Sequence, residues 1–248
     1  MNKVVLITGG SRGIGAATAL LAARKGYDVC ISFASNENAA RDIAGQIEAL
    51  SRRSLAVKAD VSLEPDILNL FETVDKTFGR LDALVNNAGI LEKQTTVEGM
   101  TLERLARVFS TNVFGSFLCA REAVKRMSKK HGGNGGAIVN NSSAAARLGA
   151  PGEYVDYAAS KAALDTLTIG LAKEVAADGI RVNAVRPGII ITDIHALGGE
   201  PGRPQRLAES IPMKRSGGAD EVAAAIVWLL SDEASYITGT LLDVTGGR

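Results

Sequence analysis

The sequence has few aromatic residues and almost no net charge. Only 4% of its 248 residues are aromatic although 46% are hydrophobic. A core must therefore be built from Ala, Val, Ile and Leu, a composition typical of a buried parallel sheet covered by helices. Lys and Arg number 28 against 27 Asp and Glu, so charge gives no reason to expect a nucleic acid or an anionic membrane as partner. We therefore expect a small-molecule partner.

The sequence also lacks cysteine clusters and long apolar runs. Cys30 and Cys119 are far apart and show no CxxC or Cys/His spacing of the kind that metals need. We expect both to be reduced core residues and expect no metal. The N-terminal apolar run is too short for a signal peptide, and the apolar segment at 222–230 is too short to span a bilayer. These features predict a cytoplasmic protein.

The chain length and its pattern predict one α/β domain covering residues 1–248. Segments with the period of strands alternate with segments with the period of helices, which predicts a doubly wound parallel sheet, the Rossmann fold, with right-handed crossovers. Residues 189–215 show little regular pattern, and we expect a substrate loop there. The expected strands are 4–7, 29–33, 55–59, 81–85, 137–141, 181–185 and 241–244, and the expected helices are 16–23, 38–50, 66–78, 101–130, 157–177 and 221–230.

A glycine-rich turn, TGGSRGIG at residues 8–15, joins the first expected strand to the first expected helix. Gly9, Gly13 and Gly15 would let the backbone approach a diphosphate closely, and the helix N-terminus would offer unpaired N–H groups to it. A glycine cluster alone is also found in ordinary tight turns, but the flanking strand and helix are the context that nucleotide binding requires. We therefore expect this turn, with Ser11, Arg12 and Ile14, to bind a cofactor.

The end of the second strand bears on which cofactor is bound. A site that prefers NAD usually has an acidic residue there to bind the ribose 2′-hydroxyl, whereas residues 32–36 contain no carboxylate. Arg12 is instead placed to face a 2′-phosphate, with Ser35 or Asn36 supplying hydrogen bonds. These features favour NADP(H) over NAD(H). The alternative is that Arg12 is a solvated loop residue and that selectivity is loose.

Polar and small residues follow two more expected strands, at the edge where open α/β sheets bind ligands. Asp60 and Val61 follow the third strand, and the Asp60 carboxylate could accept a bond from an adenine amino group. Asn87, Ala88 and Gly89 follow the fourth. We expect all five residues to contact the cofactor.

Asn112 is an amide in an apolar part of the expected helix 101–130. A buried amide needs partners, since leaving it unpaired costs about 1–3 kcal/mol. It either serves packing alone or holds a water molecule.

Tyr157 and Lys161 are four residues apart at the start of an alanine-rich helical pattern, so both side chains leave the same face of a helix. A free tyrosine has a pKa of about 10. A nearby ammonium favours the phenolate, which predicts a lowered tyrosine pKa and a role in general acid/base catalysis. Taken alone, such a pair is a common feature of helix surfaces, and the other motifs are what favour catalysis.

In the order of these motifs the chain resembles the short-chain dehydrogenase/reductase family over essentially its whole length. Within that family it is similar to bacterial members described as glucose-dehydrogenase-like or 3-oxoacyl-carrier-protein-reductase-like. The matching residues are 8–15, Asp60, Val61, 86–89, Asn112, Ser143, Tyr157, Lys161, Arg186, Pro187, Gly188 and Thr192.

The resemblance implies a role for each catalytic residue. Tyr157 would protonate the carbonyl oxygen as the nicotinamide C4 hydride arrives, or deprotonate the alcohol in reverse. Lys161 would lower the tyrosine pKa and bind the nicotinamide ribose. Ser143 would hold the substrate oxygen, and Asn112 would bind a water that relays protons. The backbone of Ile190 and the side chain of Thr192 would fix the carboxamide, in a stretch that includes Pro187 and Gly188.

The chain departs from the family pattern at the catalytic serine. Members commonly place it thirteen residues before the tyrosine, where this chain has Ala144, whereas Ser143 lies fourteen before. One extra loop residue explains the difference. Strand alternation sends Ser142 and Ser143 to opposite faces, and the match at the strand end favours Ser143. Tyr154 is a rival acid, but it falls in the loop before the helix.

The resemblance also implies a homotetramer, or a homodimer, using the helices at 102–127 and 156–176 and the C-terminal strand. Thr245 stands where an acidic residue is common, which would affect subunit contacts rather than chemistry.

The leading hypothesis is thus an NADP(H)-dependent oxidoreductase acting on a carbonyl or a secondary alcohol. A 3-oxoacyl-carrier-protein reductase would need a basic docking patch, for which Lys125, Arg126, Lys129 and Lys130 are candidates, although a solvated helix face explains them too. A sugar dehydrogenase would use polar loop residues such as His195, Glu200 and Arg203. A protein of another class, a non-catalytic nucleotide sensor with the same fold, would have no need for the catalytic side chains.

Overall fold

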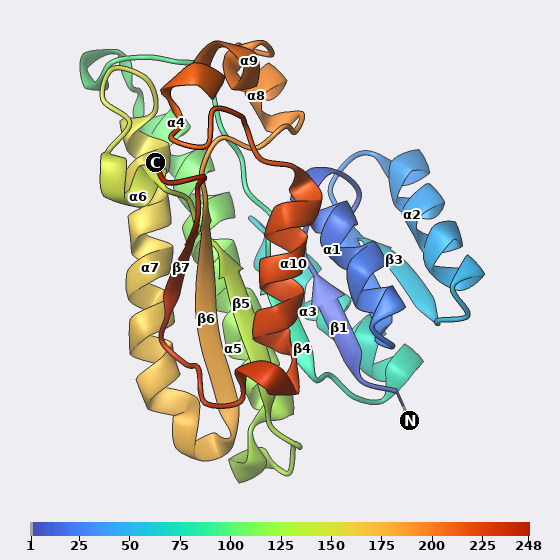
Figure 1. The fold of residues 1–248 in the computed structure, drawn as a ribbon. Helices are drawn as coiled ribbons and strands as arrows, with labels where there is room; N and C mark the ends of the chain where they lie inside the picture. The colour runs from blue at the N-terminus through green and yellow to red at the C-terminus, as the bar shows by residue number, and fades with distance from the viewer. Residues whose placement is uncertain (1) are drawn as a thin grey trace.

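The computed structural model describes residues 2–248, in which seven strands form one parallel sheet of order β3-β2-β1-β4-β5-β6-β7 (Figure 1). The order reverses between β1 and β4, so the chain winds outward in both directions from the centre. This arrangement confirms the predicted single-domain Rossmann fold. The strands are β1 (Val4–Ile7), β2 (Asp28–Phe33), β3 (Ser54–Lys58), β4 (Ala83–Asn86), β5 (Gly136–Asn141), β6 (Ile180–Pro187) and β7 (Leu241–Val244).

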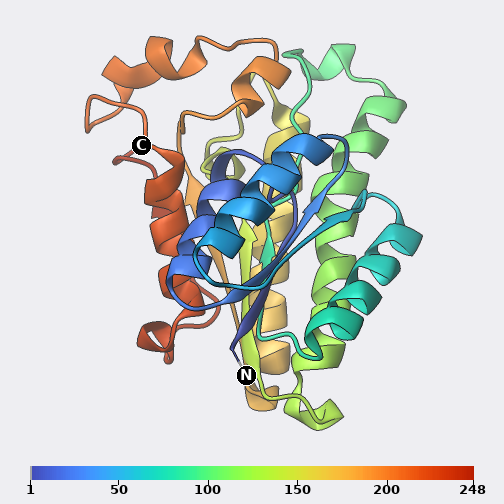
Figure 2. The ribbon, with the colours of Figure 1, turned by 90° about the vertical axis from the view of Figure 1, so that its right-hand side faces the viewer.

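Helices cover both faces of the sheet, as Figure 2 shows from the side. One layer holds α1 (Gly13–Arg24), α2 (Glu37–Ala49) and α10 (Ala219–Leu230), and the other holds α3 (Glu64–Phe78), α4 (Leu102–Phe109), α5 (Gly115–Met127) and α7 (Val155–Val175). Because side chains alternate along a strand, β1 supplies both layers. Val5 and Ile7 pack with α1 and α10, while Val4 and Leu6 pack with α3 and α5.

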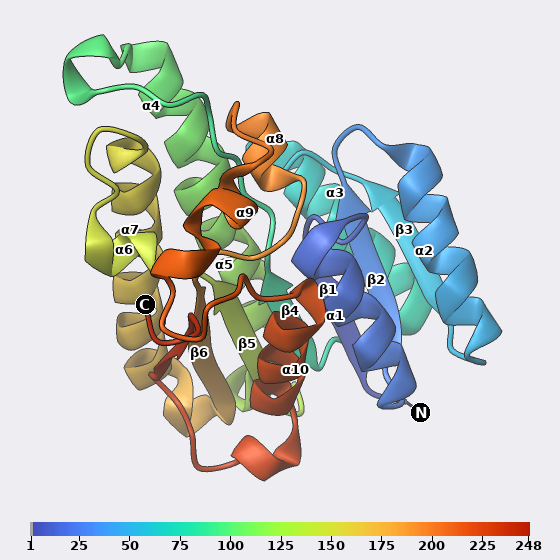
Figure 3. The same cartoon turned by 45° about the horizontal axis from the view of Figure 1, so that its top comes forward.

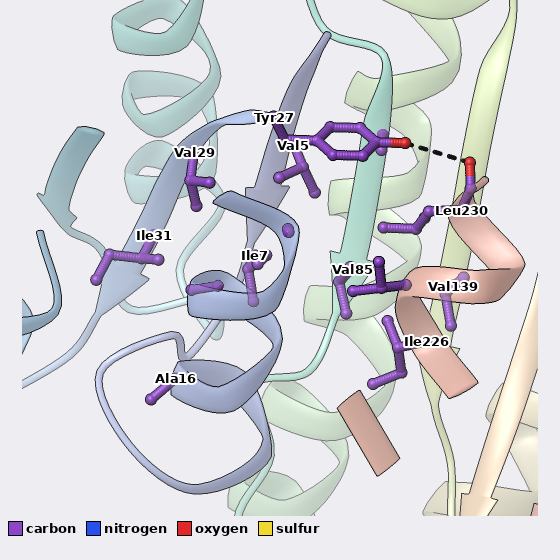
Figure 4. Close-up of a cluster of buried hydrophobic side chains, with 14 of the residues drawn as sticks. Val5, Ile7, Ala16, Tyr27, Val29, Ile31, Val85, Val139, Ile226 and Leu230 are labelled. Atoms are coloured by element: carbon purple, nitrogen blue, oxygen red, sulfur yellow. Dashed lines mark hydrogen bonds between the residues drawn. The ribbon is translucent and has the colours of Figure 1, made fainter. Parts of the chain in front are cut away.

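The core is aliphatic, as the composition predicts. In the layer of α1 and α10, branched side chains of the central strands meet alanines of α1 and the apolar face of α10 (Figure 4). The alanines Ala19 and Ala22 are completely buried, and their small side chains let α1 lie close to the sheet. Tyr27 is one of the few aromatic residues in this layer, and its hydroxyl donates to the Leu230 carbonyl.

The expected helix 101–130 consists of three segments. A π-helical turn, η2 (Ser110–Phe114), separates α4 from α5. A π turn contains one residue more per turn than an α-helix, and such turns occur often at functional sites. Just after it, a Cβ at Gly115 would lie 2.5 Å from the Val61 carbonyl oxygen. The local sequence is helical throughout, so only the tertiary contacts of this turn distinguish it.

Residues 189–215 are more regular than expected. They contain α8 (Ile194–Leu197), α9 (Arg203–Leu207) and the 3-10 turn η5 (Ala208–Ser210), which lie over the carboxyl ends of the strands (Figure 3). Helices this short leave no periodic pattern in a sequence. The remaining short segments are α6 (Ala145–Leu148), η1 (Val97–Gly99), η3 (Lys129–His131), η4 (Ala176–Asp178) and η6 (Asp232–Ala234).

Cys30 and Cys119 are free and buried, as predicted. Burial raises the pKa of the Cys119 thiol to about 12. Among residues 2–248, no helix combines the length and the apolar character needed to cross a membrane. The same residues contain no group of three His, Cys, Asp or Glu side chains placed to hold a metal ion.

Candidate active site

A cleft of about 1140 Å³ lies at the carboxyl ends of the strands and is lined in part by α8 and α9. It collects residues from widely separated parts of the sequence, because the carboxyl ends of parallel strands meet at one edge of the sheet. The predicted site residues that line it are Gly9, Ser11, Arg12, Gly13, Ile14, Ser35, Asp60, Val61, Asn87, Ala88, Gly89, Ser143, Tyr157, Lys161, Pro187, Gly188, Ile190 and Thr192.

Two predicted residues, Gly15 and Asn112, lie behind this lining. Gly15 is a packing residue, since a Cβ there would lie 2.4 Å from the Gly9 carbonyl oxygen. Asn112 is fully buried. Its Oδ1 accepts from the Ile90 N–H at 2.8 Å, and its Nδ2 donates to the Ile90 carbonyl at 3.1 Å and to Ser160 Oγ at 3.0 Å. The Asn112 side chain therefore fixes the backbone of Ile90, and the structure favours this packing role over a water site on the amide.

The glycine-rich turn has the geometry of an anion-binding loop. Gly9 and Gly13 have φ angles of 64° and 54°, in the left-handed region that favours glycine. No side chain caps the N-terminus of α1, and its first turn contains no acidic residue. The first N–H groups of α1 are thus free to bind an anion, and the positive end of the helix dipole favours one. These features fit the diphosphate of a dinucleotide.

Asn87 holds this turn in place. Its Nδ2 donates to the carbonyls of Thr8 at 2.9 Å and Gly9 at 3.0 Å, while its Oδ1 accepts from Asn141 Nδ2 at 2.9 Å. The Asn87 amide therefore makes its hydrogen bonds within the protein. Its role at the cleft is to hold the glycine-rich turn in position. Sequence reasoning assigned Asn87 to the cofactor, and the pattern carried no signal for this bracing role.

At the end of β2, Ser35 is the side chain left to face a ligand. Asn36 caps α2, because its Oδ1 accepts from the Ala39 N–H at 3.0 Å. The nearest carboxylate along the chain, Glu37, binds Arg41 at 2.5 Å and does not line the cleft. Arg12 is exposed at the cleft wall and has no carboxylate partner among residues 2–248. The part of the cleft wall formed by Arg12 and the end of β2, called here the cofactor rim, therefore carries positive charge and no acidic side chain.

Tyr157, Ser143 and Lys161 form the polar centre of the cleft. The Tyr157 hydroxyl faces the Ser143 side chain, which favours the phenolate and so lowers the pKa of the phenol. Lys161 Nζ lies 5.6 Å from the centroid of the Tyr157 ring and donates to the Asn141 carbonyl at 2.6 Å. A backbone acceptor of this kind leaves no mark in a sequence, so the role of Asn141 was missed.

The two rival residues also line the cleft, but their hydroxyl groups are bound to backbone carbonyls. Ser142 is buried, and its Oγ donates to the Lys161 carbonyl at 3.1 Å. It therefore faces away from the Tyr157 hydroxyl, as strand alternation predicts for neighbouring residues. Tyr154 is buried beneath the loop 189–215, and its hydroxyl donates to the Gly198 carbonyl at 3.3 Å. Ser143 and Tyr157 are therefore the serine and the tyrosine that meet.

Burial dominates the protonation of this centre. It raises the pKa of Tyr157 to about 12, against the lowering effect of the nearby Ser143 side chain. It lowers the pKa of Lys161 to about 8, against the effect of the Asp165 carboxylate. The predicted lowering of the tyrosine pKa by the lysine is thus not what this structure shows, because both groups are desolvated together. At neutral pH the phenol is protonated and can act as an acid.

Comparison with known proteins identifies the family. A family model described as Enoyl-(Acyl carrier protein) reductase matches residues 9–248. The uncharacterized oxidoreductase YgfF of Escherichia coli is 59% identical over 245 residues, which cover 99% of each chain. The chain belongs to the short-chain dehydrogenase/reductase family. The 3-oxoacyl-[acyl-carrier-protein] reductase FabG of Staphylococcus epidermidis is 37% identical over 247 residues, 100% of this chain and 99% of that one.

Solved structures of the family share the fold throughout. A Burkholderia cenocepacia short-chain dehydrogenase in complex with NADP matches with a TM-score of 0.91 and 35% identity, covering 99% of this chain and 97% of that one. A 3-ketoacyl-(acyl-carrier-protein) reductase from Brucella melitensis, complexed with NADH, has the same TM-score and identity over 99% and 98%. The predicted family is confirmed, and the protein is an oxidoreductase that uses a nicotinamide cofactor.

Proposed function

We propose that this protein is an NADP(H)-dependent reductase of carbonyl compounds, which also oxidises the corresponding secondary alcohols, with Tyr157 as general acid and base. The observation that carries this proposal is the Tyr157 hydroxyl, which lies beside Ser143 and one helical turn from Lys161, in the cleft that the glycine-rich turn also lines. The bound nicotinamide supplies or accepts the hydride, and the protein supplies orientation and the proton.

In the direction of reduction, Ser143 and Tyr157 both hydrogen bond to the carbonyl oxygen. The protonated phenol then gives its proton to that oxygen as negative charge develops on it. Lys161, held by the Asn141 carbonyl, lies close enough to stabilise the phenolate that remains. In the direction of oxidation, the phenolate takes the proton back from the alcohol.

We assign the cofactor contacts as the sequence predicts. Gly9, Ser11, Gly13 and Ile14 bind the diphosphate at the α1 N-terminus, and Asp60 and Val61 lie at the adenine. Asn112 fixes Ile90 beside Gly89, where a Cβ would lie 3.4 Å from both Asn112 Oδ1 and Lys161 Nζ. The backbone of Ile190 and Thr192, after Pro187 and Gly188, contact the carboxamide.

The preference for NADP(H) rests on this chain's own residues, because the compared structures include one with NADP and one with NADH. Arg12 and Ser35 line the cleft, and the only carboxylate just after β2, Glu37, is bound to Arg41. An exposed guanidinium binds a phosphate well, whereas the ribose hydroxyls of NAD(H) gain little from it.

The substrate side of the cleft favours a compact and mostly apolar carbonyl compound. Its apolar lining residues are Leu91, Ala144, Leu148, Pro151, Tyr154, Ile194 and Leu197. Two of the polar loop residues that a sugar would use, Glu200 and Arg203, are already engaged, since Arg203 binds Glu153 at 2.5 Å and Glu200 at 3.3 Å. Part of the basic run expected for a carrier protein is neutralised as well, because Glu122 binds both Lys125 and Arg126.

We also propose a homo-oligomer. Phe114 and Phe117 are 57% and 48% exposed on the helical segment of η2 and α5. Two large aromatic side chains at helical spacing on one exposed face suit burial against a second copy of the chain. Sedimentation at micromolar concentration would show a dimer or tetramer, and a monomer would contradict the proposal.

The decisive experiment compares the wild-type protein with Tyr157→Phe. NADPH and NADH oxidation would be followed with aldehydes, ketones, diketones, sugar-derived ketones and acyl thioesters. We expect turnover of small apolar ketones or diketones, and a fall of about 100- to 10,000-fold in kcat for Tyr157→Phe, the range for loss of a general acid. NADPH binding, measured by fluorescence, should remain. Turnover retained in the variant would refute the proposed role, and tight NADPH binding without any turnover in the wild type would indicate a nucleotide sensor.

A further inference from the structure

The helix that carries Tyr157 begins only two residues before it. α7 starts at Val155, and no side chain caps its N-terminus at Tyr154. Uncapped helix ends fray because their first N–H groups have no partner within the helix. Asp156 supplies the missing acceptor, since its Oδ1 accepts from the Tyr157 N–H at 2.9 Å. A carboxylate in the first turn also interacts favourably with the helix dipole.

Asp156 is itself held by a buried arginine. Arg104 and Asp156 are 8% and 3% exposed. Arg104 Nε donates to Asp156 Oδ2 at 2.7 Å, and Nη2 donates to Oδ1 at 3.3 Å. This two-point contact fixes the direction of the carboxylate as well as its distance, which a lysine could not do. Neither side chain lines the cleft.

Arg104 joins three segments that surround the site. Its third contact, from Nη1, is to the Lys93 carbonyl at 2.6 Å, in the segment that follows β4. The same segment is held at Ile90 by Asn112, from the π turn that continues α4. The first turn of α7, the segment after β4 and the start of α4 are therefore fixed relative to one another through one guanidinium.

We propose that Arg104 and Asp156 are positioning residues for the reaction. Their ion pair fixes the first turn of α7, and through it the placement of the Tyr157 hydroxyl against the substrate carbonyl and the cofactor. This proposal rests on the proposed function of Tyr157. Stability alone does not account for the pair, because buried ion pairs are commonly no more stabilising than apolar residues of similar volume. The pair instead fixes the orientation of the first turn of α7, which carries Tyr157.

The test replaces both charges together, in Arg104→Met/Asp156→Leu, so that no buried charge is left unpaired. Melting temperature, the Kd of NADPH by fluorescence and kcat with the preferred ketone would be measured. We expect a folded protein that binds NADPH within about twofold of wild type but has a kcat lower by about tenfold or more, since misplacing a reacting group by about 1 Å costs on the order of 100-fold. A double variant with wild-type kcat would overturn the proposal.

Two conservative variants keep the test decisive if the double variant folds poorly. Asp156→Asn keeps an acceptor for the Tyr157 N–H, and Arg104→Lys keeps the charge without the two-point contact. Both should retain NADPH binding, and Asp156→Asn should keep more of its kcat than Asp156→Ala. A purely structural role predicts instead that kcat per folded molecule stays unchanged in all of them, whatever happens to the melting temperature.

A matched control comes from the opposite end of the sheet. Asp28 is buried and bound by Arg53 at 3.0 Å, and Arg53→Met/Asp28→Leu should leave kcat unchanged even if stability falls. Tyr157→Phe separates the two proposals. An active Tyr157→Phe protein would overturn the proposed function and the positioning role together. An inactive one, beside a fully active Arg104→Met/Asp156→Leu protein, would overturn the positioning role alone.

Discussion

The two ends of the sheet treat their buried polar groups differently. At the amino end, the buried Asp28 is paired with Arg53, and the largely buried Asp82 is paired with Arg80. At the carboxyl end, several buried polar atoms have no protein partner among residues 2–248. These atoms are Oδ1 of Asn86 and of Asn141 at the ends of β4 and β5, Oδ1 of Asp165 beside Arg186, and Nδ1 of His195 and Nη1 of Arg248 at the cleft.

Asp28 and Lys161 show how this difference affects the stability of the fold. Burial opposes ionisation of Asp28, but hydrogen bonds from Arg53 and Asn2 outweigh it and lower the pKa of the carboxyl. Its charge therefore stabilises the fold. Burial also opposes ionisation of Lys161, and there it prevails, so the lysine pKa falls to about 8. The lysine charge thus destabilises the fold at neutral pH, and such groups concentrate where chemistry is done.

Among the variants that test this difference, Lys161→Met should have the largest effect, because it removes the destabilising charge at the catalytic end of the sheet. We expect kcat to fall by on the order of 100-fold or more, because proton transfer at Tyr157 loses its supporting charge. Stability should rise. One pKa unit corresponds to about 1.4 kcal/mol, and after the hydrogen bond to the Asn141 carbonyl is lost, the net gain near neutral pH should be about 2 kcal/mol.

The pH dependence of unfolding tests the sign of this effect. Lys161 has a pKa of about 8 in the folded protein, against an ordinary lysine pKa of 10.5. Between these values the unfolded chain binds more protons, so wild-type stability should gain from this group as the pH rises. The gain should be absent in Lys161→Met, as measured by urea unfolding across this range. A variant less stable than wild type at pH 7 would contradict the interpretation.

The cofactor rim offers the next largest effect. Arg12→Ala should raise the KM for NADPH by about 10- to 100-fold, since a charge-assisted hydrogen bond contributes about 1.5–3 kcal/mol. The KM for NADH should change little, because NADH has no 2′-phosphate. Ser35→Asp adds the carboxylate that the β2 end lacks, and it should improve NADH relative to NADPH. Equal losses for both cofactors in Arg12→Ala would instead make Arg12 a general diphosphate contact.

Features that depend on local sequence periods and on the ends of parallel strands could be predicted from the sequence. The strands and long helices were predicted to within a few residues, because buried strands and amphipathic helices leave their periods in the sequence. The motifs converged on one cleft because parallel strands end at one edge of the sheet. Thus Ser143 and Tyr157, fourteen residues apart in sequence, were predicted to share a site and lie together in the cleft.

What sequence reasoning missed depends on contacts between distant segments. The π turn at Ser110–Phe114 is held by the bonds of Asn112 to Ile90. Lys161 is held by a backbone carbonyl, and no residue type encodes such an acceptor. The Arg104–Asp156 pair joins residues far apart in the chain. The direction of the Tyr157 pKa was wrong for the same reason, since burial is a property of the assembled fold.

The smallest effect should come from Asp28→Asn at the amino end of the sheet. Arg53 is about half exposed and can be solvated when its partner is lost, so we expect a loss of only about 1–2 kcal/mol at neutral pH and an unchanged kcat. Because the folded pKa of Asp28 lies below the ordinary aspartate value of 3.8, the contribution is present above pH 3.8 and is lost as the pH falls through the folded value. Wild type and variant should therefore converge in stability in acid, as measured by urea unfolding between neutral pH and pH 2 or 3. A lowered kcat in Asp28→Asn would show that the two ends of the sheet are coupled, and the division between a stabilising end and a catalytic end would then fail.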